Sequence, residues 1–255
     1  MPVLDRFRLD GRTALVTGAS RGLGAAMARA LAEAGADVAL HASQYADAGA
    51  ARDLANACGV RTVALAADLA QRDAPDRLLE EATASLGHID ILVNNAGIIR
   101  RADAHEYSDA DWDEVLMVDL SNVFRLCRAV GRGMLARGSG KIINIASMLA
   151  FQGGTRVPAY AAAKGGVAQL TKALANEWAA RGVNVNAIAP GYMRTDNTQA
   201  LRDDASRNEA ITARIPAGRW GEPEDLAGAV VFLASPASDY VHGYILAVDG
   251  GWLAR

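Results

Sequence analysis

The chain has 255 residues, of which 51% are hydrophobic and 22% are charged, and its formal net charge is -3 at pH 7. This length fits one large α/β domain, and the composition excludes a disordered protein. The slightly acidic balance, without a block of like charge, argues against a nucleic-acid-binding surface.

The N-terminus and the cysteines bear on the compartment. The first residues, MPVLDRFRLDGRT, lack the apolar stretch of a secretory signal, and no uncharged apolar run reaches the ~18 residues of a membrane span. Cys58 and Cys127 are far apart and have no C-x-x-C spacing, which indicates a reducing compartment and no disulfide framework. We expect a soluble cytoplasmic protein with no membrane and no nucleic-acid partner.

Short apolar or β-branched runs alternate with longer helical runs along the chain. The expected strands are residues 12–18, 37–42, 61–68, 89–97, 140–147, 183–190 and 244–250. The expected helices are residues 22–34, 47–58, 74–85, 111–136, 159–180 and 224–234. This alternation predicts βαβ units and a parallel sheet buried on both faces. We expect one α/β domain over residues 1–255, with a helical lid at residues 192–216 and ligands beyond the carboxyl ends of the strands.

A glycine-rich run, TGASRGLG at residues 17–24, joins the first expected strand to the first helix. Gly18, Gly22 and Gly24 allow a tight turn, close approach of a pyrophosphate and close packing of the helix on the strand. The helix N-terminus that follows supplies free N–H groups and a favourable dipole for phosphate. A glycine cluster alone is weak evidence, but its place in a βαβ unit favours dinucleotide binding.

A second run, VPAYAAAKGG at residues 157–166, places Tyr160 and Lys164 one helical turn apart. Taken alone, such a pair is more often a solvated surface pair. Ser147 ends the fifth expected strand thirteen positions before Tyr160, and the run NNAG at residues 94–97 follows the fourth. Together with the G-x-x-x-G-x-G spacing, these motifs resemble the short-chain dehydrogenase/reductase family over essentially the whole chain.

The resemblance implies a single Rossmann-type doubly wound domain with a mainly seven-stranded parallel sheet, an NAD or NADP cofactor, and no metal. It implies that Tyr160 is the general acid–base, that Ser147 hydrogen-bonds the substrate oxygen, and that Lys164 holds the nicotinamide ribose. A free phenol has a pKa near 10, so we expect the Lys164 ammonium and the nicotinamide charge to lower the pKa of Tyr160.

One position departs from the family pattern. The family usually places an asparagine in the long helix before the fifth strand, where it anchors a water of a proton relay to the lysine. In the run VDLSNVFRL, Asp119 stands at that position. An aspartate can accept a bond from that water, but it adds charge near Lys164. Asn122 is three positions further on and is expected to face elsewhere.

The residues at the end of the second expected strand indicate whether the coenzyme is NAD or NADP. Enzymes specific for NAD commonly carry an acidic residue there, but Ala42 and Ser43 occupy the place here. Arg21 could pair with a 2′-phosphate, which favours NADP(H). No arginine stands at position 43, so NAD(H) remains open. By resemblance, the dinucleotide contacts are expected at Gly18, Ser20, Arg21, Gly22, Leu23, Gly24, Ser43, Asp68, Leu69, Asn95, Ala96, Gly97, Tyr160, Lys164, Pro190, Gly191, Met193 and Thr195.

The lid is rich in Arg, Asp, Asn, Thr and Gln, which favours a small polar substrate over a steroid or an acyl chain. Arg156, Arg100 and Arg101 are placed where an arginine could clamp a carboxylate, although each is about as often a solvated surface residue. The expected substrate residues are Ser147, Arg156, Tyr192 and Arg100. Three later stretches resemble family members that act on small keto sugar acids such as 2-dehydro-3-deoxy-D-gluconate.

Two alternatives stay open. A reductase of 3-oxoacyl thioesters is suggested by TGASRGLG and LSNVFRL, and a basic patch beside the lid would favour it. A non-catalytic dinucleotide-binding regulator is the other, although such proteins typically lose the tyrosine or the lysine. The C-terminal run AVDGGWLAR resembles the inter-subunit tail of the family, which implies a homotetramer.

Overall fold

The computed structural model describes residues 2–43 and 57–255. Within them, seven parallel strands form one sheet in the order β3-β2-β1-β4-β5-β6-β7. The strands are β1 (Thr13–Val16), β2 (Asp37–Ala42), β3 (Thr62–Ala66), β4 (Ile91–Asn94), β5 (Gly140–Ile145), β6 (Val183–Pro190) and β7 (Ile245–Val248). The α-helices are α1 (Gly22–Glu33), α3 (Ala74–Leu86), α4 (Asp109–Leu116), α5 (Asn122–Arg137), α6 (Pro158–Trp178), α7 (Gln199–Asp203), α8 (Ala205–Arg214) and α9 (Ala227–Ala234).

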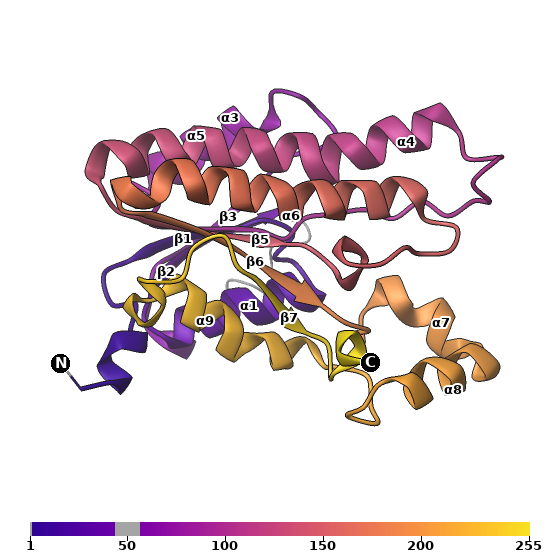
Figure 1. The fold of residues 1–255 in the computed structure, drawn as a ribbon. Helices are drawn as coiled ribbons and strands as arrows, with labels where there is room; N and C mark the ends of the chain where they lie inside the picture. The colour runs from indigo at the N-terminus through magenta and orange to yellow at the C-terminus, as the bar shows by residue number, and fades with distance from the viewer. Residues whose placement is uncertain (1, 44–56) are drawn as a thin grey trace.

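The sheet lies between two layers of helices (Figure 1). Helices α3, α4, α5 and α6 cover one face, and α1 and α9 cover the other. Each face has its own apolar core, because alternate residues of a strand point to opposite sides. On β1, for example, Leu15 belongs to one core, whereas Ala14 and Val16 belong to the other. The single doubly wound domain expected from the sequence is confirmed.

The strand order explains where a ligand can bind. The order reverses between β1 and β4, so the loops after these two strands run in opposite directions and leave a crevice at the carboxyl edge. Residues 17–24, 95–97 and 147 all follow strand ends at this edge. The sheet therefore brings together the motifs that lie far apart in the sequence.

Two expected helices need comment. The helix expected at residues 47–58 lies almost entirely outside the described residues. The helix expected at residues 111–136 is interrupted: α4 ends at Leu116, a π-helical turn covers Met117–Ser121, and α5 begins at Asn122. In this turn the Asn122 N–H bonds the Met117 carbonyl, one residue further back than in an α-helix. The turn changes which side chains face inward, and Asp119 becomes fully buried.

The lid forms between β6 and β7, where α7 and α8 stand beside the C-terminus (Figure 1). A small core of its own holds it, in which the Tyr192 ring lies edge-on to the Trp220 and Trp252 rings at centroid distances of 5.3 and 4.8 Å. The C-terminal tail is thus part of the lid. In the described part of the chain, no helix is long and apolar enough to cross a membrane.

Candidate active site

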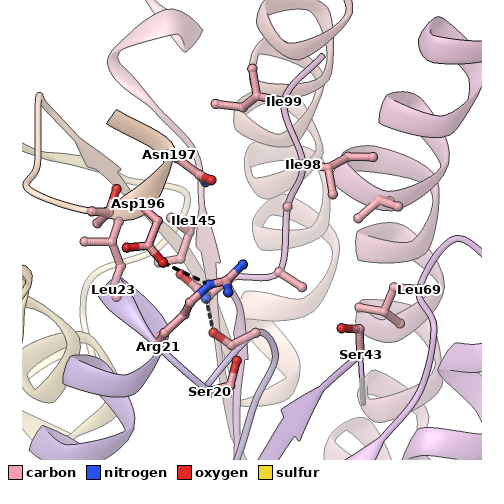
Figure 2. A pocket seen from close by; sticks show the side chains of 18 of the residues that line it. Ser20, Arg21, Leu23, Ser43, Leu69, Ile98, Ile99, Ile145, Asp196 and Asn197 are labelled. Carbon is pink, nitrogen blue, oxygen red and sulfur yellow. Dashed lines mark hydrogen bonds and ion pairs between the residues drawn. The ribbon is translucent and has the colours of Figure 1, made fainter. Parts of the chain in front are cut away.

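A pocket of about 400 Å³ opens at the carboxyl edge of the sheet (Figure 2). Every residue expected to contact a dinucleotide lines it, from Gly18 in the glycine loop to Thr195 at the start of the lid. Ser147, Tyr160 and Lys164 line the same pocket. The fold thus brings the glycine loop, the second-strand end and the expected catalytic group into one cavity.

The glycine loop is shaped for close approach of a phosphate. Gly18 and Gly22 have φ of +63° and +55°, in the left-handed region that favours glycine. A Cβ at Gly24 would overlap the Gly18 carbonyl oxygen, so α1 begins directly against the loop. Asn95 Nδ2 donates to the carbonyls of Thr17 and Gly18 at 2.9 and 3.0 Å, which fixes the loop to the end of β4. These residues therefore fit the phosphates of a dinucleotide.

The other end of the pocket bears on the coenzyme. Ala42 is buried and Ser43 is exposed, and neither brings a carboxylate to the end of β2. Arg21, expected to meet a 2′-phosphate, lies 3.4 Å from Asp196 of the lid, with both side chains mostly exposed. Figure 2 shows Ser43 and Leu69 on the opposite side of Arg21 from Asp196. Such an exposed pair contributes little free energy, so it does not prevent Arg21 from turning to a phosphate.

Tyr160 and Lys164 lie one turn apart on α6, and the Lys164 Nζ is 5.3 Å from the centre of the Tyr160 ring. Nζ donates to the Ile145 carbonyl at 3.0 Å, at the end of β5. Ser147 Oγ accepts a bond from the Leu149 N–H at 3.2 Å, so it caps a short helix as a structural serine would. That bond uses an acceptor position only, and the hydroxyl proton stays free for another acceptor.

Asp119 lies behind this group and does not line the pocket. Its Oδ1 accepts from the Ile98 N–H at 2.8 Å, and its Oδ2 is 3.3 Å from the Lys164 Nζ. At that distance no water fits between the carboxylate and the ammonium, so the arrangement is a direct ion pair rather than the water-bridged one considered from the sequence. Asn122 does face elsewhere, since its Nδ2 donates to the carbonyls of Leu69 and Gln71.

The pKa of the Tyr160 phenol is raised above its usual 10. Burial is the largest cause, and the Asp119 carboxylate adds to it, whereas Lys164, Ser147 and Arg101 act in the opposite direction. The lysine therefore lowers the phenol pKa as expected, but the groups of the protein do not make the phenol acidic overall. The pKa of Lys164 is itself raised, because the Asp119 carboxylate and the Tyr160 phenol outweigh the opposing effect of burial, so the lysine stays charged.

Three of the four expected substrate residues do not line the pocket. Arg100 bonds both oxygens of Glu114, with its Nη2 2.8 Å from one of them. Arg156 lies 3.0 Å from Asp103 and has a φ of +65°, which is unusual for a residue with a Cβ. The third, Tyr192, packs inside the lid. The sequence could not reveal these contacts, because each partner belongs to another segment.

Arg101 differs from its two neighbours in this respect. Its Nη2 donates from the loop after β4 to the backbone carbonyl of Asn197 at 3.3 Å; Asn197 lines the pocket, whereas Arg101 itself does not. Among the described residues, no carboxylate lies within ion-pair distance of it, and it is close enough to Tyr160 to lower the phenol pKa. The sequence suggests all three arginines as carboxylate ligands. Arg101 differs from the other two because their guanidiniums are already paired with carboxylates of the chain.

Further pocket residues carried no signal in the sequence. The lining also includes His41, Ala67, Ile98, Ile99, Glu114, Ile145, Asp196 and Asn197. They are placed there by strand ends and by the lid rather than by a motif.

Comparison with known proteins agrees with this geometry. Residues 18–253 match a family model of the short-chain type described as enoyl-(acyl carrier protein) reductase. The chain is 54% identical over 254 residues to 2-dehydro-3-deoxy-D-gluconate 5-dehydrogenase from Escherichia coli (strain K12), covering 99% of this chain and 100% of the relative.

Two solved structures are also similar. One is a putative 2-deoxy-D-gluconate 3-dehydrogenase from Agrobacterium tumefaciens with bound NADP, with a TM-score of 0.91, 57% identity and coverage of 98% of this chain and 99% of that one. The other is a gluconate 5-dehydrogenase from Burkholderia cenocepacia J2315 in complex with NADP and tartrate, with a TM-score of 0.94, 44% identity and 99% coverage of both. The chain therefore belongs to the short-chain dehydrogenase/reductase family of oxidoreductases, which use NAD or NADP.

Proposed function

We propose that the protein interconverts a ketone and a secondary alcohol on a small sugar acid such as 2-dehydro-3-deoxy-D-gluconate, with NAD(H) or NADP(H) as the cofactor. The observation that carries the substrate class is Arg101, a cation without a carboxylate partner in the described chain, which bonds the pocket-lining Asn197 and is close enough to Tyr160 to lower its pKa. A carboxylate bound there would form charge-assisted hydrogen bonds with a guanidinium. The relatives named for sugar acids support the same class.

The lining at the substrate end also fits a small polar molecule. Asn197 and Thr198 of the lid, which are not among the expected dinucleotide contacts, line the same pocket as Ser147. An acyl chain would need an apolar wall, and the apolar side chains of the lid are instead packed into its own small core. This arrangement disfavours the alternative of a thioester reductase.

The protein's residues have separate roles in the proposed reaction. The bound dinucleotide supplies or accepts the hydride. Tyr160 gives a proton to the substrate oxygen during reduction and takes it during oxidation. Ser147 donates a hydrogen bond to the same oxygen through its free hydroxyl and keeps its proton. Lys164 has three N–H donors, of which one bonds Ile145 and another faces Asp119, so the third is free for a hydroxyl of the dinucleotide ribose.

We further propose that the protein is a cytoplasmic homotetramer. Support comes from β7, which ends the sheet, and from the exposed Tyr240 and Tyr244 before it, since an unpaired edge with apolar side chains favours association. Light scattering after size exclusion measures the mass, and a stable monomer would contradict the tetramer.

The function is tested with a substrate panel. Purified protein is assayed at 340 nm with each cofactor against 2-dehydro-3-deoxy-D-gluconate, gluconate and 2-deoxy-gluconate for oxidation, and against acetoacetyl and enoyl thioesters for reduction. We expect turnover of at least one sugar acid and none of the thioesters. Activity confined to the thioesters would overturn the sugar-acid proposal. Dinucleotide binding without turnover of any member would favour a regulator.

A further inference from the structure

His41 is a buried titratable residue for which the proposed reaction has no use. It is the penultimate residue of β2, only 2% of it is exposed, and it lines the pocket beside the glycine loop. Neither the glycine motif nor the catalytic motif includes it. A buried ionisable group at a binding site calls for an explanation, because burial costs free energy unless its hydrogen bonds are satisfied.

The partners of the ring fix its protonation state. Nε2 is 2.8 Å from the Ala67 carbonyl oxygen, which can only accept, so Nε2 carries the proton. Nδ1 is 3.2 Å from the Gly18 backbone nitrogen, whose N–H can only donate, so Nδ1 is unprotonated. Only the neutral ring with its proton on Nε2 satisfies both partners. If Nδ1 were protonated, its N–H and the Gly18 N–H would both be donors, and the hydrogen bond between them would be lost.

These bonds connect three strand ends. The ring joins Gly18 after β1 to Ala67 after β3, and the His41 carbonyl accepts from the Ala19 N–H at 2.8 Å. Two consecutive amides of the glycine loop therefore end on one residue of β2. Because Gly18 has a left-handed backbone, the loop depends on such contacts to keep its shape.

The surroundings favour the neutral ring. Burial lowers the pKa of His41 below 6.5, and the bond to Ala67 opposes this only in part. The charged residues on the adjoining described segments are engaged elsewhere: Arg21 faces Asp196, and Asp68 accepts from the Ala70 N–H. The ring thus titrates on the acid side of neutrality, where its bond to Gly18 is lost.

We propose that His41 is a positioning residue for the dinucleotide, whose neutral ring holds the glycine loop in its binding shape and whose protonation releases the loop. The inference rests on dinucleotide binding at this pocket and not on the identity of the sugar acid. Binding should accordingly weaken as the pH falls into the acid range where the ring takes up its proton, and be constant at neutral and higher pH.

The test measures dissociation constants of NADH and NADPH by fluorescence between pH 5 and 8. For the wild type we expect the constant for each to rise at least about fivefold from pH 7.5 to pH 5. NADH has no 2′-phosphate, so its titration excludes protonation of that group as the cause. His41→Gln keeps an amide donor and acceptor but does not titrate, and its constants should change less than about twofold over the same range.

Two variants and one direct readout complete the test. His41→Leu should weaken binding by about 2- to 12-fold at every pH, as expected for one lost hydrogen bond of about 0.5–1.5 kcal/mol. His88→Gln is the matched control, since His88 is half-exposed before β4 at the opposite edge of the sheet. The protection factor of the Gly18 amide against hydrogen exchange, measured without dinucleotide, should fall in acid in the wild type but not in His41→Gln.

Constant wild-type affinity across this range would overturn the proposal, and so would tighter binding in acid, which would make the ring a cation for phosphate. Either result leaves the proposed function intact. Failure to bind either dinucleotide at pH 7.5 would contradict the proposed function itself.

Discussion

The glycine loop after β1 and the lid after β6 line the same pocket, but different interactions hold them in place. The loop is held by backbone groups, with Asn95 bonded to the carbonyls of Thr17 and Gly18. The lid instead meets arginine side chains from other segments, with the Asp196 carboxylate facing Arg21 and the Asn197 backbone carbonyl accepting from Arg101. Backbone geometry depends on small residues at fixed spacing, whereas side-chain pairing depends on the neighbours that the fold supplies. The two halves should therefore respond to different substitutions.

The largest effect, a loss of turnover, is expected on substitution of Tyr160, the proton donor. Tyr160→Phe removes the phenol that exchanges a proton with the substrate, and general acid–base catalysis is typically worth about 10²- to 10⁴-fold. We expect kcat to fall by about that factor while the dissociation constant of the dinucleotide stays within about twofold. Tyr107→Phe is the control, since its hydroxyl bonds only the Arg100 carbonyl in the described chain. Turnover retained in Tyr160→Phe would refute the assigned role.

The glycine loop, which is the dinucleotide-binding part of the pocket, is tested by adding one methyl group at Gly24. Gly24→Ala places a Cβ on the Gly18 carbonyl oxygen, and neither backbone segment can yield cheaply. We expect dinucleotide affinity to fall at least about tenfold, which corresponds to about 1.4 kcal/mol, as measured by fluorescence titration. Gly228→Ala in α9 is the control, because nothing lies within 4 Å of its Cβ and alanine favours a helix. Equal affinity in both variants would show that the loop is not closely packed.

The substrate half is tested by comparing three arginines. Arg101→Gln should raise KM for the sugar acid by about 10- to 100-fold, as expected for a lost charge-assisted hydrogen bond of about 1.5–3 kcal/mol, with little change in dinucleotide affinity. Arg100→Gln and Arg156→Gln should raise KM less than about threefold, because both guanidiniums already bond carboxylates of the chain. A larger effect at Arg156 than at Arg101 would reverse the assignment. Steady-state kinetics with the preferred cofactor measures all three.

The smallest effect, a shift in the pH profile of oxidation, is expected on substitution of Asp119, which lies behind Tyr160 and Lys164. Oxidation needs the phenolate form of Tyr160, and the Asp119 carboxylate raises the phenol pKa. Asp119→Asn removes that charge and leaves the Lys164 ammonium unopposed, so the phenol pKa falls. The acid limb of kcat/KM for oxidation should then move to lower pH. Asp113→Asn, an exposed acid on α4, should leave the limb in place. An unmoved limb in a folded Asp119→Asn would show that the carboxylate acts only structurally.

The fold and the nucleotide half could be predicted almost completely from the sequence. The expected strands each contain an observed strand, and every expected dinucleotide contact lines the pocket. The strands and the glycine turn follow from local rules, since β-branched runs form buried strands and glycines at fixed spacing permit one turn, whereas the other dinucleotide contacts follow from the family resemblance. The π-helical turn at Met117–Ser121 was not predictable in this way. Its one-residue shift matches no periodic pattern, and the bond from Ile98 to Asp119 accompanies it.

By itself, the sequence determined the doubly wound architecture, the glycine loop and the pairing of Tyr160 with Lys164 and Ser147. Each of these depends on spacing within one segment or on the order of segments along the chain. The tertiary structure decided which of the three arginines has no carboxylate partner among the described residues, how Asp119 meets Lys164, and that His41 bonds the Gly18 amide of the glycine loop. These properties depend on atoms brought within about 3 Å of each other from distant segments, and hydrogen bonds and ion pairs at that range exist only after the sheet has formed.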